Sequence, residues 1–113
     1  MEAVKQILAG ILLEARAQWR EAVTDAGNLG YRLKVAEREE REAAFAFRTI
    51  EMEILDPEKD MPSLEKLDQA HKEMNRCRDV TDKIKKHRQL AVDHLSSCEQ
   101  AVNNAYKEFL KEP

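Results

Sequence analysis

The sequence predicts an all-α fold: a long antiparallel helical hairpin of the coiled-coil type, which self-associates into a four-helix bundle. Two of the chain's three prolines, Pro57 and Pro62, lie near the midpoint of its 113 residues, and both arms carry apolar residues at three- and four-residue spacing. Charged residues make up 36% of the chain and aromatic residues 5%, which is typical of long solvated helices and argues against a sheet protein.

The prolines set the topology. Proline lacks the amide hydrogen that a helix interior needs, and it disfavours helical backbone in the residue before it. We therefore expect a helix over about residues 2–55, a turn over about 56–62 and a helix over about 63–111, within a single domain spanning 1–113. Folding about this turn brings residue i of the first arm close to residue 118 − i of the second.

The first arm has a strict heptad pattern from its tryptophan onward. Its apolar stripe comprises Trp19, Ala22, Ala26, Leu29, Leu33, Ala36, Glu40, Ala43, Phe47, Ile50 and Ile54. Upstream, we expect Val4, Leu8, Ile11 and Ala15 to continue the stripe through a four-residue stutter. Gly27 and Gly30 together cost about 2 kcal/mol of helix propensity relative to alanine. They leave two alternatives open, a continuous helix with a kink and a break that gives three helices.

The second arm repeats the pattern. Its stripe comprises Leu67, Ala70, Met74, Cys77, Thr81, Ile84, Arg88, Ala91, Leu95, Cys98, Val102, Ala105 and Phe109. One position of the heptad is mostly small (Ala70, Cys77, Ala91, Cys98, Ala105), which favours close packing of antiparallel helices. The 118 − i relation also predicts that Glu40, a charge on the first stripe, pairs with Arg78.

Charge is segregated along the chain. Residues 51–68 hold seven acids and two lysines, a net of −5, and residues 72–88 hold seven bases and three acids, a net of +4. We name two candidate binding surfaces from them. The acidic tip is Glu51, Glu53, Glu58 and Asp60, and the basic shoulder is Lys83, Lys85, Lys86 and Arg88.

The end that holds both termini is apolar instead. Residues from Val4 to Leu13 present an apolar face wider than one partner helix needs, with Tyr106, Phe109 and Leu110 expected opposite. This terminal apolar surface predicts self-association into a homodimer. We assign it to Val4, Leu8, Ile11, Leu12, Trp19, Tyr106 and Phe109.

These patterns favour a non-enzymatic module that binds a protein partner as an adaptor, chaperone or inhibitor. We expect no enzymatic activity and no cofactor, because the sequence shows no nucleophile–base pair or phosphate loop. One alternative is nucleic-acid binding through residues 72–88, which the net charge of −3 does not favour.

A second alternative is a metal-holding bundle that uses His94 and Cys98, four residues apart, although a structural zinc takes four ligands. The spacing of the two cysteines rules out a disulfide within one helix, so we expect a reducing compartment, the cytoplasm. The apolar run from Ile7 to Leu13 is too short to span a membrane.

Overall fold

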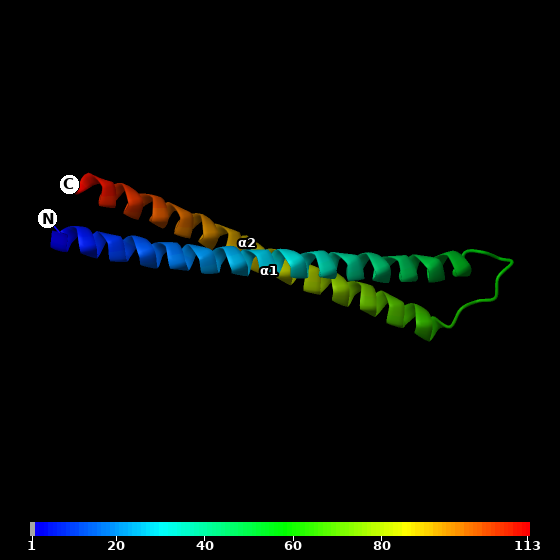
Figure 1. Ribbon diagram of the computed structural model, residues 1–113. Helices are drawn as coiled ribbons and strands as arrows, with labels where there is room; N and C mark the ends of the chain where they lie inside the picture. The colour runs from blue at the N-terminus through cyan, green and yellow to red at the C-terminus, as the bar shows by residue number, and fades with distance from the viewer. Residues whose placement is uncertain (1) are drawn as a thin grey trace. The chain divides into compact units, whose positions relative to one another are not determined.

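The computed structural model describes residues 2–113 and consists of two long helices joined by one loop (Figure 1). Helix α1 spans Glu2–Ile54 and helix α2 spans Leu64–Lys111. The two run antiparallel and pack against each other, and no strand occurs among residues 2–113. The predicted all-α helical hairpin is confirmed.

Local hydrogen bonds hold the loop between the helices. The last turn of α1 closes when the Leu55 amide donates to the Glu51 carbonyl at 3.0 Å. Asp56 then accepts the Glu58 amide on Oδ1 at 3.0 Å, a side-chain turn that stands in for a backbone turn. At the other end, the Ser63 hydroxyl accepts the Lys66 amide at 3.4 Å and caps the start of α2. The loop therefore begins at Asp56, which favours a turn after α1, and ends at Ser63, which favours the start of α2.

The chain divides into two compact units, and each contains a segment of both helices. We call Met1–Gly30 with His87–Pro113 the terminal unit, and Tyr31–Lys86 the loop unit. In the terminal unit, the Lys5 ammonium donates to the Glu112 carbonyl at 3.0 Å. In the loop unit, the rings of Phe47 and His71 lie 5.3 Å apart. Both pairs follow the expected 118 − i relation to within one residue.

The seam between the helices is the predicted heptad stripe. Eight residues among 2–113 are buried, and all of them belong to it: Ala22, Leu33, Ala36, Ile50, Cys77, Thr81, Ile84 and Cys98. Thr81 is fully buried, and its hydroxyl donates to the Cys77 carbonyl at 3.0 Å, so its burial leaves no unmet hydrogen bond. In the loop unit, Leu33, Ala36 and Ile84 form one buried cluster.

The predicted stutter near the N-terminus is wrong. Val4 and Ile11 are 43% and 51% exposed, whereas Lys5, Leu8 and Leu12 are half-buried. Lys5, Leu8, Leu12 and Ala15 continue the spacing of the downstream seam without an insertion. An unbroken heptad keeps one face of α1 against α2, so no local unwinding is needed.

Helix α1 continues through both glycines. Gly27 and Gly30 are helical, and neither has a positive φ. A Cβ added at Gly27 meets nothing within 4 Å, and one added at Gly30 lies 3.7 Å from Nε of Arg88. Arg88, on the predicted stripe, is exposed rather than buried, and its guanidinium passes over Gly30 toward solvent.

The expected pairing of Glu40 with Arg78 is also wrong. The four ion pairs among residues 2–113 each join residues three or four apart on one helix, and Glu40 takes part in none of them. Arg78 is exposed because it lies one residue beyond the buried seam residue Cys77. One residue turns a helix by about 100°, so the Arg78 side chain leaves the seam.

We predict that replacing Gly27 with alanine stabilises the protein. The helix gains about 1 kcal/mol because alanine restricts the unfolded chain and meets no obstacle in the folded one. Gly30→Ala should act in the same direction, since its new methyl makes only an ordinary contact with Arg88. Urea unfolding followed by circular dichroism measures both changes.

The matched control is Ala17→Gly, the reverse change at an exposed position of the same helix. It should lower the unfolding free energy by about 1 kcal/mol. A Gly27→Ala variant less stable than the wild type would contradict a continuous α1.

Candidate functional site

The acidic tip lies at the C-terminus of α1 and in the loop. Glu51, Glu58 and Asp60 are exposed, and Glu53 is half-buried. Glu51 and Glu53 lie in the last turn of α1, which contains no basic residue. The backbone dipole makes a helix C-terminus electronegative, so carboxylates there oppose helix stability. The position of these acids is therefore not explained by support of the helix.

An apolar groove lies beside the acidic tip, between the last turns of α1 and the first turns of α2. Its volume is about 370 Å³. Half-buried seam residues form its floor: Phe47 and Ile54 from α1, and Leu67 from α2. We call this feature the loop-end groove.

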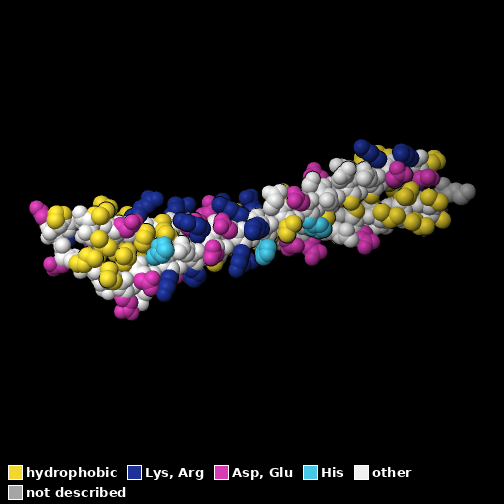
Figure 2. All heavy atoms as spheres, turned by 180° about the vertical axis from the view of Figure 1, so that it is seen from behind, with side chains coloured by type: hydrophobic (Ala, Val, Ile, Leu, Met, Phe, Trp, Pro, Cys, Tyr) yellow, Lys and Arg dark blue, Asp and Glu magenta, His cyan; other side chains and the backbone are white. Residues whose placement is uncertain are grey.

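The rim of the loop-end groove combines exposed leucines with polar groups. Leu55 is 80% exposed and Leu64 is 68% exposed, and they come from opposite sides of the loop. Glu51, Asp68 and His71 complete the lining. Figure 2 shows hydrophobic side chains gathered at the loop end with acidic groups beside them, and Lys and Arg side chains further along the loop unit. The groove is thus an exposed apolar surface in an acidic setting.

The basic shoulder divides between the two units. Lys83, Lys85 and Lys86 are exposed on α2 in the loop unit. Arg88 belongs to the terminal unit, where it lies against Gly30. In the loop unit the shoulder is therefore a run of three lysines.

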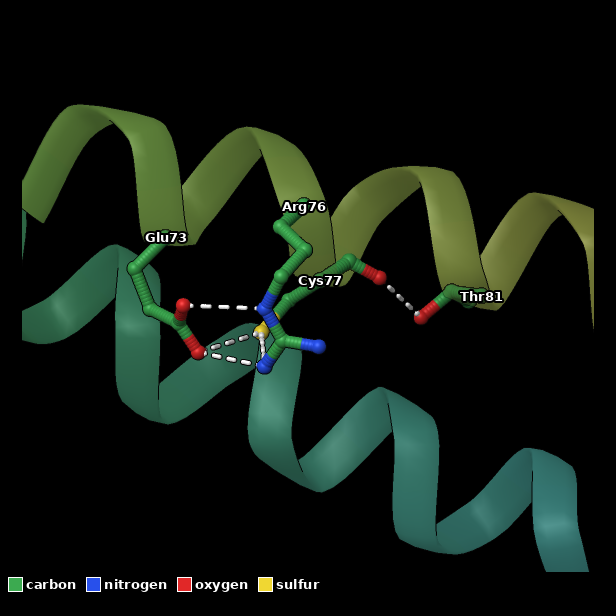
Figure 3. A network of polar contacts seen from close by, with 4 residues as sticks. All are labelled: Glu73, Arg76, Cys77 and Thr81. Atoms are coloured by element: carbon green, nitrogen blue, oxygen red, sulfur yellow. Dashed lines mark hydrogen bonds and ion pairs between the residues drawn. The ribbon is translucent and has the colours of Figure 1, made fainter.

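A polar network precedes the shoulder on α2 (Figure 3). Arg76 donates from Nε to Glu73 Oε2 at 2.9 Å and from Nη2 to Glu73 Oε1 at 2.5 Å. The Cys77 thiol donates to the same Oε1 at 3.6 Å. The hydrogen bond from Arg76 holds the pKa of Glu73 below its usual value, and the same bond raises the pKa of Arg76.

Burial, with a smaller contribution from the hydrogen bond to Glu73, raises the pKa of the Cys77 thiol. A buried thiol with a raised pKa is a poor nucleophile. The network is therefore suited to holding side chains in place on α2, and its geometry suggests no reaction.

The residues assigned to the terminal apolar surface fall into two groups. Val4, Ile11 and Tyr106 are exposed, whereas Leu8, Leu12, Trp19 and Phe109 are half-buried on the seam of the terminal unit. The Lys5 ammonium lies 4.7 Å from the centre of the Phe109 ring. The second group is thus already used to join α1 to α2.

The exposed apolar side chains of the terminal unit lie on two flanks of the seam. Val4, Ile7 and Ile11 recur at three- and four-residue spacing and share one flank of α1. Tyr106 and Leu110, four residues apart on α2, lie on the other flank by the heptad geometry of an antiparallel pair. The seam therefore lies between these two exposed sets, and the face expected from Val4 to Leu13 is divided between the seam, which takes Leu8 and Leu12, and the flank of Val4, Ile7 and Ile11.

His94 and Cys98 lie on one turn of α2, with His94 Nε2 3.6 Å from Cys98 Sγ. Among residues 2–113, no group of three or more His, Cys, Asp and Glu side chains is placed to hold a metal ion. Two side chains are too few for a structural zinc site. The contact reads as a weak hydrogen bond beside the seam.

Sequence reasoning missed the loop-end groove, although a signal for it was present. Leu55 and Leu64 are apolar residues off both heptad stripes, one on each side of the proline loop. They fall on the same flank of the seam as Glu51, Asp68 and His71. Off-stripe apolar residues that flank a loop on one side indicate such a groove.

Neither helix contains a stretch of the length and apolarity needed to cross a membrane, within residues 2–113. Comparisons with protein-family models, with curated proteins and with solved structures found no match.

The Glu73–Arg76 pair predicts a pH dependence of stability. The folded-state pKa of Glu73 lies below the ordinary value of 4.5, so the pair stabilises the fold above that value. The stabilisation is lost as pH falls through the lowered pKa. Urea midpoints of the wild type and of Glu73→Gln should differ at neutral pH and converge in acid. A difference that persists unchanged in acid would contradict this assignment.

Proposed function

We propose that this chain is a non-enzymatic helical module that binds a protein partner through the charged surfaces of its loop unit. The observation that carries the proposal is the acidic tip, whose charges oppose the helix that bears them. Glu51 and Glu53 sit in the last turn of α1, where a basic residue would stabilise the helix. An acidic surface that lowers the stability of its own helix is suited to binding a basic surface of a protein partner.

The arrangement of the other charges supports the same proposal. The tip and the three lysines of the shoulder belong to one unit and carry opposite signs. Such a pattern favours a partner with the complementary order of charges, because complementarity accelerates association and selects orientation. Adaptor, chaperone and inhibitor roles all use a surface of this kind. The free cysteines are consistent with a cytoplasmic setting, which we include in the proposal.

We also propose that the chain forms a homodimer through the flank of Val4, Ile7 and Ile11. Ile7 is 65% exposed, and the three residues make a continuous apolar stripe on one flank of α1. Two such stripes can pack against each other as antiparallel or parallel neighbours in a four-helix bundle. Burial of this stripe offsets the small core of a two-helix hairpin.

The acidic tip can be tested by charge reversal. We predict that changing Glu51, Glu53, Glu58 and Asp60 to lysine abolishes capture of the partner from an extract of the native cell. Helicity should be retained, because these side chains lie outside the buried seam. Quantitative mass spectrometry of the captured proteins, with circular dichroism of the variant, measures both outcomes.

A matched control reverses four exposed acids of the terminal unit: Glu14, Glu21, Asp25 and Glu99. It changes the net charge equally and should leave capture intact. Equal capture by the tip variant and the wild type would overturn the proposal. Loss of capture in both variants would show that only net charge matters.

The basic shoulder distinguishes a protein partner from nucleic acid. The variant Lys83→Glu, Lys85→Glu, Lys86→Glu should weaken partner capture, whereas the wild type should bind a labelled oligonucleotide duplex no better than this variant does. Binding of the duplex that weakens steeply with salt and is lost in the variant would favour the nucleic-acid alternative.

Self-association can be tested by light scattering. We predict a dimer mass for the wild type at micromolar concentration and a monomer mass for Ile7→Glu, Ile11→Glu. These positions are chosen because Leu8 and Leu12 lie on the seam, where a charge also disrupts the hairpin itself. The control is Leu90→Glu, an exposed leucine of the same unit. A wild-type monomer would contradict the dimer.

A further inference from the structure

We propose that the loop-end groove binds an amphipathic helix that carries apolar anchor side chains flanked by lysine or arginine. This inference rests on the proposed function and specifies the chemistry of the partner segment. The loop-end groove adds an apolar binding site to the charged surfaces of the loop unit. Binding of a defined peptide tests the groove separately from partner capture by the charged surfaces.

The shape of the groove favours a helical occupant. Its floor is made by side chains from both helices, Phe47 on α1 and Leu67 on α2, so the groove follows the seam between them. The valley between two packed helices is the position that a third helix takes in a bundle. Anchors spaced three and four residues apart on such a helix can enter the valley together.

The size and openness of the groove favour a peptide over a small molecule. About 370 Å³ lies near the lower limit of small-ligand pockets, at roughly 300 Å³. The rim leucines remain largely exposed, Leu55 on one side of the loop and Leu64 on the other. An occupant that covers both must extend beyond the floor, and a helix of a few turns does so.

The electrostatic setting determines the flanks of the occupant. Glu51 and Asp68 line the groove itself, and residues 51–68 carry a net charge of −5. Asp68 is already paired with Lys72 at 2.9 Å, whereas Glu51 takes part in none of the ion pairs among residues 2–113. Basic residues beside the apolar anchors therefore meet attraction from the groove wall and from the acidic tip.

Fluorescence anisotropy with a defined probe tests the proposal. The probe is a fluorescein-labelled peptide of about four helical turns in which leucines form one face and lysines the remainder. Two control peptides have glutamates in place of the lysines, or the same composition scrambled to remove the apolar face. The proteins are the wild type, Leu64→Glu, Leu55→Ser and Leu90→Glu, each checked for helicity.

We expect the leucine–lysine probe to bind the wild type and to bind Leu64→Glu at least about tenfold more weakly, since the substitution removes an apolar rim contact and places a carboxylate against the leucine face of the probe. Weaker binding by Leu64→Glu is diagnostic because the added negative charge alone would strengthen binding of a basic peptide. Leu55→Ser should weaken binding in the same direction. Leu90→Glu should bind as the wild type does, because Leu64 and Leu90 are both 68% exposed and only Leu64 lines the groove.

Equal binding of the probe to Leu64→Glu and the wild type would overturn the inference. Equal binding of the scrambled peptide would also overturn it, because charge alone would then suffice. If Leu64→Glu changes the oligomer mass of the protein without probe, measured by light scattering, the groove binds a second copy of the chain. That result would overturn the proposal of a helical peptide as its occupant. If the probe fails to bind but tip reversal still abolishes partner capture, the proposed function stands and the groove inference falls.

Discussion

The close approach of α1 and α2 along one seam is the constraint on which the rest of the structure depends. Two helices can cover each other along one stripe only, and among residues 2–113 this stripe holds the eight buried residues. Small residues such as Ala22, Ala36 and Cys98 let the backbones come near, and larger ones fill the space beside them. Side chains off this stripe are left to solvent, which is why many large apolar side chains are exposed.

Among residues 2–113, the seam fixes the register without an ion pair between the two helices. The four ion pairs of the described residues, 2–113, lie within single helices and are exposed, so they contribute little to how α1 aligns with α2. The small position of the α2 heptad is occupied by a large residue once, at Ile84, which packs with Leu33 and Ala36. A shift of one heptad would move Ile84 away from that cluster. An apolar contact of specific shape thus favours one alignment of α1 with α2.

The hairpin was predictable because its signals are local and mutually consistent. Prolines at the midpoint, heptads in both arms and matched arm lengths all require the same topology, and the 118 − i relation follows from them. The N-terminal phase was mispredicted because α1 carries two apolar stripes there. One contains Val4 and Ile11 and the other Leu8 and Leu12, and only the second continues the heptad of Trp19, which packing against α2 retains.

The candidate site was predicted in part. The tip acids and shoulder lysines were recognisable as charge runs, since surface charge needs no tertiary structure to identify it. The prediction of a Glu40–Arg78 pair was wrong because the 118 − i relation gives the position of a residue along the helix axis. It does not give the direction in which the side chain points around that axis. The loop-end groove was missed for a similar reason. Leu55 and Leu64 come together on one flank only when two helix ends are placed side by side, which heptad counting in either arm does not show.

The positions of the two cysteines allow local opening of the hairpin to be measured in each unit. Cys77 is buried in the loop unit and Cys98 in the terminal unit, each facing the opposite helix. A reagent in solution reaches either sulfur only while the helices around it are apart, so the rate of alkylation at each thiol measures how often that unit opens. In Cys98→Ser, the alkylation rate of Cys77 reports the opening of the loop unit alone. In Cys77→Ser, the alkylation rate of Cys98 reports the opening of the terminal unit. Because a cysteine occupies one small position of the heptad in each unit, each half of the hairpin can be observed separately.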